Sequence, residues 1–208
     1  MKKTLLSLSF SPRVDSTSAA LADGFIADWH KANPDADLRQ RALGRDVIAG
    51  PDEAWIAANM TPEADRTPEQ AERLAASDQA IADLHAASHI VIATPMFNFG
   101  LPWTLKSYVD LIIRVGKTFS FDPATGFGPL LSADKKLMIV WSSAGEYQPG
   151  TPTAPFDHLT PYLRQIFGFM GVTQSEAVSA GNMWGGPEAA AASLASARAR
   201  LAALSPNW

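Results

Sequence analysis

The fold of this chain is decided by residues 88–102, which read SHIVIATPMFNFGLP. Residues 90–93 are continuously apolar, which is typical of a central parallel strand that is covered on both faces. Pro95 ends this strand, an aromatic and amide loop follows, and an amphipathic helix begins near Trp103. In an open sheet of alternating strands and helices, such a junction at the carboxyl end of a strand is where ligands bind.

Strands and helices alternate along the whole chain. Apolar spacing predicts strands at residues 4–9, 38–43, 88–94, 136–141 and 172–179, and helices at 19–33, 52–58, 68–87, 103–115, 159–169 and 187–204. This alternation indicates a parallel sheet wound by right-handed crossovers. We therefore expect an α/β fold in which residues 1–208 form a single domain. Five strands fit a flavodoxin-like, doubly wound parallel sheet of order 2-1-3-4-5 with helices on both faces, and we expect this arrangement.

Three segments need separate interpretation. Residues 44–68 carry three X-Pro turns and predict an excursion over the surface. Residues 118–121 and 127–131 are rich in Phe and predict a small hairpin or flap. The first ten residues imitate a signal peptide, but their apolar run is only about seven residues long and Arg13 follows shortly. We predict a first strand there instead.

Composition excludes several classes of function. The net charge is −4 and no block of Lys or Arg stands out, so neither nucleic acid nor an anionic membrane is an expected partner. The chain has no Cys, which excludes disulfides, thiolate metal sites and Cys nucleophiles. No apolar run reaches the length of a membrane span, and we expect a cytoplasmic protein.

Metal and hydrolase chemistry also lack support. The four histidines show no metal-ligand spacing, and we expect no metal site. There is no G-x-S-x-G elbow of the kind that α/β-hydrolases carry.

The loop after the first strand is rich in hydroxyl groups: Ser11, Ser16, Thr17 and Ser18. Hydroxyls and free backbone N–H groups at a helix start can form an anion site, because the helix dipole adds to the donors. An ordinary helix cap explains the same residues equally well. Neither a P-loop motif nor G-x-G-x-x-G follows this strand, so an NTPase or dinucleotide-type Rossmann site is not expected.

The loops after the third and fourth strands should meet the first loop at one edge of the sheet. The third-strand loop holds Pro95, Met96, Phe97, Asn98 and Phe99. Its aromatic groups suit the face of a flat ring and its amide suits a polar ring edge, although core packing is the alternative. The fourth-strand loop holds Ser142, Ser143, Ala144 and Gly145, whose small side chains either let backbone N–H groups approach a ligand or simply form a turn. Together the three loops favour a phosphate-bearing flat heterocycle, of which flavin mononucleotide (FMN) is the simplest.

The sequence resembles the FMN-dependent NADH:quinone oxidoreductases and azoreductases, which are flavodoxin-like homodimers. The similarity is carried by PMFNF at 95–99, LKSYVDL at 105–111, GKTF at 116–119, LTPYL at 159–163, FGFMG at 167–171 and GPE at 186–188. It extends over nearly the whole chain in the same order and is weakest at residues 44–67.

This resemblance implies how FMN is held. Ser11, Ser16, Thr17 and Ser18 would bind its phosphate. Met96 to Phe99 would line the isoalloxazine ring, with Asn98 on its polar edge, and Pro95 is also an expected cofactor-binding residue. Ser142 to Gly145 would face the pyrimidine end. Flavin N5 would carry hydride from NADH or NADPH to a quinone or azo compound in a ping-pong reaction that needs no catalytic side chain.

The resemblance also defines departures and a substrate side. The family usually has Ser-Arg-Gly-Gly where this chain has residues 142–145, and a methyl group at Ala144 would be strained if φ were positive there. Tyr147 stands where some members carry a His. Tyr147, Phe121 and Phe169 are the expected substrate-binding residues, the two Phe forming an aromatic clamp that could cross a dimer interface. A flavodoxin-like electron carrier, and a related fold that has lost flavin, are the alternative functions.

Overall fold

The structure is a computed structural model that describes residues 2–46 and 48–208. Its strands are β1 Thr4–Ser9, β2 Asp37–Arg41, β3 His89–Pro95, β4 Phe119–Asp122, β5 Gly126–Pro129, β6 Lys136–Ser142 and β7 Gln174–Ala180. Its α-helices are α1 Thr17–Ala32, α2 Glu53–Met60, α3 Pro68–Ala86, α4 Trp103–Ile112, α5 Thr160–Met170 and α6 Pro187–Leu204. Short 3₁₀ turns lie at Glu63–Asp65, Ala154–Phe156 and Ser205–Asn207.

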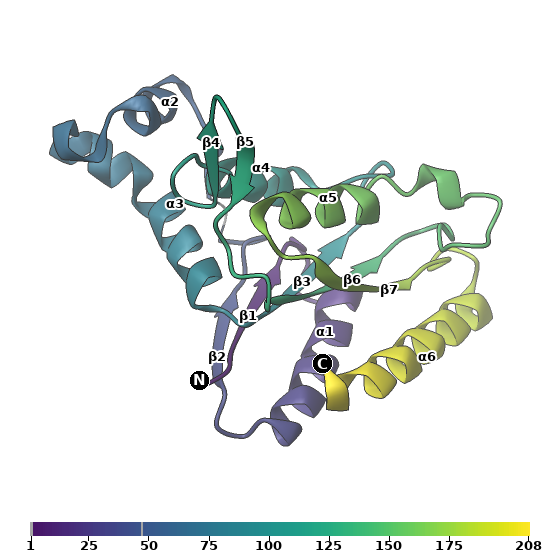
Figure 1. Ribbon diagram of the computed structural model, residues 1–208. Helices are drawn as coiled ribbons and strands as arrows, with labels where there is room; N and C mark the ends of the chain where they lie inside the picture. The colour runs from purple at the N-terminus through teal and green to yellow at the C-terminus, as the bar shows by residue number, and fades with distance from the viewer. Residues whose placement is uncertain (1, 47) are drawn as a thin grey trace.

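Five of these strands form one parallel sheet in the order β2-β1-β3-β6-β7, which is the predicted order 2-1-3-4-5 (Figure 1). β3 lies at its centre, with Ala93 opposite Ser9 on one side and Val140 on the other. Both faces of β3 are buried, as its continuous apolar run predicts. The flavodoxin-like fold expected from the sequence is therefore confirmed.

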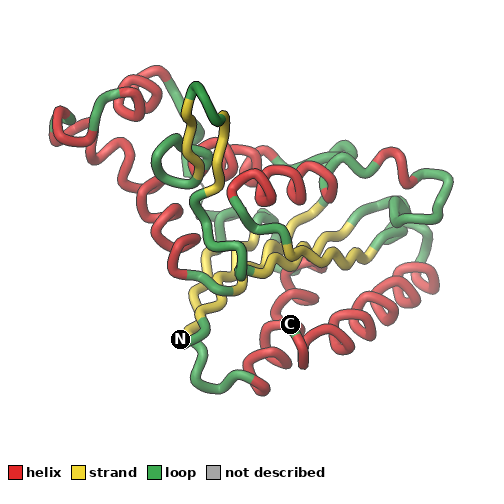
Figure 2. The backbone as a smooth tube through the Cα atoms, in the orientation of Figure 1, coloured by secondary structure: helices red, strands yellow, loops and turns green. Residues whose placement is uncertain are grey.

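Helices cover both faces of the sheet, as Figures 1 and 2 show. Leu5, Val91 and Met138 belong to one buried cluster, which they share with α1 and α6. Their sequence neighbours, Leu6 and Ile90 among them, belong to a second cluster shared with α3, α4 and α5. Successive strand residues alternate between faces, so each apolar strand serves two cores at once. This explains why β1, whose sequence imitates a signal peptide, is a buried inner strand.

The excursion at residues 44–67 is anchored by a buried arginine. Arg114 is only 1% exposed; its Nε donates to Asn59 Oδ1 at 2.7 Å and its Nη1 pairs with Asp78 at 2.5 Å. Its guanidinium also lies over the Trp55 ring, 5.8 Å from the centroid. The sequence predicts the excursion and its short helix but does not reveal this anchor, because Arg114 is more than fifty positions away from Asn59.

Gly44 sets the position of the loop after β1. Its N–H donates to the Ser9 carbonyl at 2.9 Å, and a Cβ placed on it would lie 2.3 Å from the Ser11 carbonyl oxygen. Only glycine permits so close an approach of two backbones. The excursion is thereby held against the first hydroxyl-rich loop.

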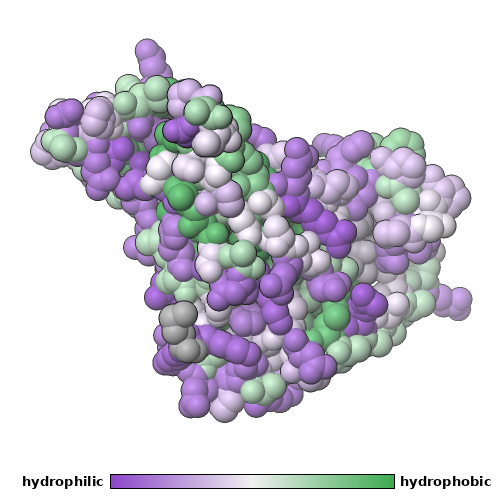
Figure 3. All heavy atoms as spheres, in the orientation of Figure 1, coloured by the Kyte–Doolittle hydropathy of each residue, from purple (hydrophilic) through white to green (hydrophobic). Residues whose placement is uncertain are grey.

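The hairpin β4-β5 projects from the body of the molecule beside α5 (Figures 1 and 2). Hydrophobic residues gather around it on the face shown in Figure 3, and Phe121 and Phe127 are 54% and 65% exposed. A patch of this kind indicates an interaction surface. Among the residues described, no helix is both long and apolar enough to span a membrane.

Candidate functional site

The carboxyl ends of β1, β3 and β6 meet at one edge of the sheet and surround a cavity of about 590 Å³. Ligand pockets commonly have volumes of about 300–1,000 Å³. The residues that line it are Ser11, Pro12, Arg13, Ser16, Thr17, Pro95, Met96, Phe97, Asn98, Phe99, Ser142, Ser143, Ala144, Tyr147, Met183 and Trp184. The three loops that the sequence singles out are thus brought together.

The first wall of the cavity is the amino end of α1. Ser16 is the N-cap and its Oγ accepts from the Ala19 N–H at 3.3 Å, so the capping interpretation is correct. The backbone N–H groups of Thr17 and Ser18 make no hydrogen bond within the described part of the chain. These donors and the helix dipole favour an anion at this position. The same residues can therefore cap α1 and still offer backbone donors to an anion.

Charged side chains contribute little to this wall. Arg13 lines the cavity, but its guanidinium pairs with Asp15 at 2.6 Å in an exposed ion pair. The hydrogen bond from Arg13 lowers the pKa of the Asp15 carboxyl below its usual value. Since Arg13 is paired with Asp15, the backbone N–H groups at the start of α1 are the better candidates for binding an anion.

The second wall is a strained two-residue turn. Phe97 and Gly100 exchange backbone hydrogen bonds of 3.1 and 3.0 Å, and the two residues between them, Asn98 and Phe99, have φ of 48° and 67°. Positive φ at both central positions is typical of a type I′ turn, where the second position favours glycine. Phe99 in the left-handed region costs about 1–2 kcal/mol. Such strain is characteristic of loops that present groups to a ligand.

The turn presents aromatic rings rather than burying them. Phe97 and Phe99 are 45% and 44% exposed, whereas Met96 is buried in the core beneath them. The Tyr147 ring meets Phe99 edge-on, with centroids 5.7 Å apart, and Phe156 lies on Phe99 at 5.4 Å. Core packing therefore accounts for Met96 but not for the two Phe side chains.

The third wall, residues 142–145, is tied to the loop after β7. The carbonyls of Ser143, Ala144 and Gly145 accept from Met183, Trp184 and Asn182 respectively, at 2.8–3.1 Å. The N–H groups of Ala144 and Gly145 have no hydrogen-bond partner among residues 2–46 and 48–208. The carbonyl groups of this loop are therefore used within the protein, whereas two of its N–H groups are available to a ligand.

The Ala144 methyl group causes no strain. The non-glycine residues with positive φ in the described chain are Asn98, Phe99 and Asn182, so Ala144 lies outside the left-handed region. The backbone of this loop does not need glycine at that position. With Ser143 and Ala144 in place of the usual Arg-Gly, the N–H groups of residues 144 and 145 are still available as donors. The Ser143 hydroxyl donates to the Gly145 carbonyl at 2.7 Å.

Sequence reasoning and structure differ at several positions. Pro12, Arg13, Met183 and Trp184 line the cavity but were not among the predicted site residues. Met183 and Trp184 follow β7, whose carboxyl end lies at the same edge, so the predicted topology already contained the signal for them. Ser18 and Gly145, which were predicted to bind the cofactor, do not line the cavity, although their neighbours Thr17 and Ala144 do.

Phe121 and Phe169 lie in a separate aromatic cluster. Phe127 bridges them, with ring centroids 5.0 Å from Phe121 and 5.7 Å from Phe169. Within one chain the cluster is not part of the cavity lining.

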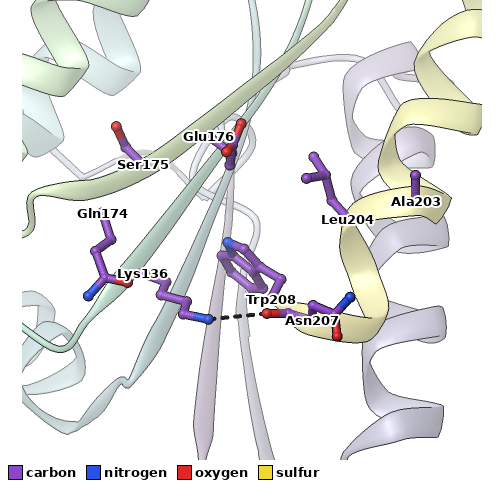
Figure 4. Close-up of a pocket in the computed structure, with 8 residues that line it drawn as sticks. All are labelled: Lys136, Gln174, Ser175, Glu176, Ala203, Leu204, Asn207 and Trp208. Atoms are coloured by element: carbon purple, nitrogen blue, oxygen red, sulfur yellow. Dashed lines mark hydrogen bonds between the residues drawn. The ribbon is translucent and has the colours of Figure 1, made fainter.

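A second cavity of about 370 Å³ lies at the opposite edge of the sheet, where β6 and β7 begin (Figure 4). In Figure 4 the Lys136 amine reaches the Asn207 carbonyl, to which it donates at 3.3 Å. Ligands of open α/β sheets bind at the carboxyl ends of strands. The loops with free donors surround the first cavity, which is therefore the better candidate site.

Comparison with known proteins agrees with this fold. The flavodoxin-like fold family matches the chain over residues 3–204. An FMN-dependent NADH:quinone oxidoreductase from Nostoc sp. is 39% identical over 205 residues, which cover 98% of this chain and 99% of the relative. A protein of the same name from Bordetella petrii is 41% identical over 202 residues, which cover 97% of this chain and 95% of the relative.

Solved structures show the same fold. An azoreductase from Bacillus anthracis has a TM-score of 0.88 and 23% identity, with 99% of this chain and 100% of that one covered. An FMN-dependent NADH-azoreductase from the same species, solved in complex with FMN, has a TM-score of 0.87 and 22% identity, with 98% of each chain covered.

Proposed function

The chain belongs to the flavodoxin-like family of FMN-dependent NADH:quinone oxidoreductases, and on that premise we propose that it binds FMN in the cavity described above. As a single FMN-binding domain, it passes hydride from NADH to quinones or azo compounds. The observation that carries the proposal is a single cavity with an aromatic wall that is also lined by Thr17 and Ala144, whose backbone N–H groups have no partner among the described residues. A cytoplasmic location forms part of the proposal, because NADH is supplied there.

The residues present fit FMN. A phosphate fits the amino end of α1, where Thr17 and Ser18 offer backbone N–H groups. A flat ring fits the exposed Phe97 and Phe99, and its polar edge fits the Asn98 amide, which is exposed and lines the cavity. Each part of the cofactor thus has a matching surface.

Hydride transfer in two half-reactions, the ping-pong scheme, is the chemistry that FMN supplies when bound. The chain contributes binding and electrostatics. The N–H groups of Ala144 and Gly145 are placed to stabilise negative charge at the pyrimidine end, as the donors of an oxyanion hole do. Tyr147 and the exposed Trp184 also line the cavity, and they would shape the space for the nicotinamide and the acceptor.

Anaerobic titration tests this proposal. The purified protein reconstituted with FMN should lose its flavin absorbance on addition of NADH and regain it when a quinone is added. Double-reciprocal plots at several quinone concentrations should be parallel, as a ping-pong sequence requires. Flavin that is bound but not bleached by NADH would instead indicate an electron carrier, and failure to bind FMN would contradict the proposal altogether.

Asn98→Gly is expected to separate flavin binding from folding. Glycine accepts the positive φ of the turn, so the free energy of unfolding should change by no more than about 0.5 kcal/mol. The affinity for FMN should fall about five- to tenfold, because one net hydrogen bond contributes roughly 1 kcal/mol. Fluorescence titration with FMN and urea unfolding measure the two quantities. An unchanged FMN affinity would remove Asn98 from the site.

We further propose that the active form is a homodimer in which the hairpin β4-β5 of one chain reaches the substrate side of its partner. The exposed Phe121, which lies outside its own chain's cavity, supports this arrangement. An apolar hairpin that projects from the body is suited to such a contact.

Phe121→Ala is expected to raise the KM for the acceptor up to about tenfold while the rate of reduction by NADH stays the same, because an aromatic contact contributes about 0.5–1.5 kcal/mol. Steady-state kinetics with a quinone and stopped-flow reduction by NADH check this. Phe121→Leu, which retains the apolar volume, is the matched control, and light scattering should show that each variant stays dimeric. Unchanged acceptor kinetics in Phe121→Ala would eliminate the clamp.

A further inference from the structure

A third cavity, of about 200 Å³, lies between the β1-β2 edge of the sheet and the helices α3 and α4. It is lined by Leu8, Arg41, Leu43, Ile48, Ala76, Gln79, Ala80, Asp83 and Tyr108. It shares no lining residue with the candidate FMN cavity. Its walls are mainly apolar, with polar groups at one end.

Tyr108 is the unusual feature of this cavity. The side chain projects from α4 and is 2% exposed, and its hydroxyl has no hydrogen-bond partner among residues 2–46 and 48–208. A buried polar group left unpaired costs about 1–3 kcal/mol. Burial, with a contribution from Asp83, raises the pKa of the Tyr108 hydroxyl, which therefore stays protonated and able to donate.

Asp83, on α3, offers the complementary group. Its carboxylate is almost fully buried; Oδ1 accepts from Arg39 at 3.0 Å and from Gln79 at 3.2 Å, and Oδ2 accepts from Arg41 at 2.7 Å. A carboxylate has about four lone-pair sites, so one acceptor position on Oδ2 stays open. The two arginines balance its charge, and a neutral donor suits the open position better than a cation.

We propose that this cavity binds a monocyclic phenol. The aromatic ring lies among Leu8, Leu43 and Ala80, and the ligand hydroxyl accepts from Tyr108 and donates to Asp83. The size agrees, because a cavity of about 150 Å³ holds benzene, and 200 Å³ leaves room for one substituent but not for a second ring. The ligand thus completes the one hydrogen bond that the buried tyrosine lacks.

The test is an NMR titration of the full-length protein with phenol, toluene and 2-naphthol. Phenol should bind saturably and shift the amide signals of residues around Leu43 and Ala80. Toluene, which lacks the hydroxyl, should bind about thirtyfold more weakly, the difference that two net hydrogen bonds of roughly 1 kcal/mol each produce. 2-Naphthol has two rings and should not fit, so the amide signals around Leu43 and Ala80 should not shift when it is added.

Two variants locate the site. Ala80→Leu fills the cavity and should abolish phenol binding here without touching the FMN cavity. Tyr108→Phe removes only the unpaired hydroxyl, so the protein should fold at least as stably, lose about five- to tenfold in phenol affinity and keep its affinity for toluene. Tyr162→Phe, at a half-buried tyrosine outside the cavity, is the matched control.

Each other outcome contradicts the proposal. Absence of saturable phenol binding would mean that the cavity holds water only. Binding that survives Ala80→Leu would place phenol elsewhere, for example in the FMN cavity. Equal phenol affinities in the wild-type protein and Tyr108→Phe would show that the tyrosine does not select the ligand.

Discussion

Replacing Ser16 by Asp is expected to lower the affinity for FMN by about a hundredfold or more while α1 stays intact. Asp caps helices as well as Ser does, so the bond from the Ala19 N–H can be retained. The new carboxylate, however, lies where the phosphate of FMN would sit. Two like charges about 4–5 Å apart repel by roughly 3–4 kcal/mol at an effective dielectric constant near 20, which exceeds a factor of a hundred in affinity.

Matched variants and ligands make this prediction specific. Ser16→Asn keeps the cap without a charge and should lose less than about tenfold in FMN affinity. Riboflavin, which has no phosphate, should bind Ser16→Asp and the wild-type protein equally well. Fluorescence titration measures these FMN and riboflavin affinities, and circular dichroism checks the helix. Equal FMN affinity in Ser16→Asp and Ser16→Asn would show that the phosphate does not bind at the start of α1.

The second large effect is expected from His89, whose protonation should destabilise the fold in mild acid. The imidazole is 5% exposed and lies between Trp29 and Trp208, with ring centroids 5.0 and 4.9 Å away. Burial, reinforced by Lys3 and Lys136, lowers the pKa of His89 from 6.5 to about 4. The folded protein therefore keeps this ring neutral where the unfolded chain protonates it.

The direction of the pH effect follows from proton binding. Between pH 6.5 and 4 the unfolded state binds a proton at His89 that the folded state does not. The free energy of unfolding should therefore fall as the pH falls through this window, by about 3 kcal/mol in total, and this contribution should be constant above pH 6.5.

Urea unfolding at a series of pH values measures this effect. In His89→Phe, which keeps a ring between the two Trp side chains but cannot titrate, the decline between pH 6.5 and 4 should be shallower by about 3 kcal/mol. His158→Phe, at an exposed position, is the control. A wild-type decline that persists unchanged in His89→Phe would assign the acid sensitivity to other groups.

Much of the fold could be predicted because local signals agree with it. β1 and α6 begin and end at the predicted residues. A short apolar run marks β1, and the Pro after Gly186 marks the start of α6. The capping box at Thr67 fixes the start of α3 in the same way. The end of α4 differs from the prediction: the helix stops at Ile112 rather than at residue 115. Thr118 Oγ1 donates to the Ile112 carbonyl, and the chain turns there toward the hairpin.

The site could be predicted in outline but not in its geometry. Residue types and strand order bring Ser16, Asn98 and Ser142 to one edge, and the structure places all three around the cavity. The sequence does not predict the positive φ of Phe99, because bulky aromatic residues disfavour that conformation. The predicted strand order already brings Met183 and Trp184, which follow β7, to this edge, but the pairing of their loop with residues 143–145 is a tertiary contact with no local pattern.

The parallel sheet has a consequence for how the chain acquires its structure during synthesis. β1 is an inner strand, yet Ser88, beside its central neighbour β3, lies 84 positions after Thr4. A ribosome that releases the chain from its amino end exposes Leu5, Leu6 and Leu8 to water until the middle of the protein has emerged. Folding must then close long loops before β1 gains its second partner, which makes it slower than that of a helical protein of equal length. The newly made amino-terminal third is thus the part of this protein most in need of a chaperone.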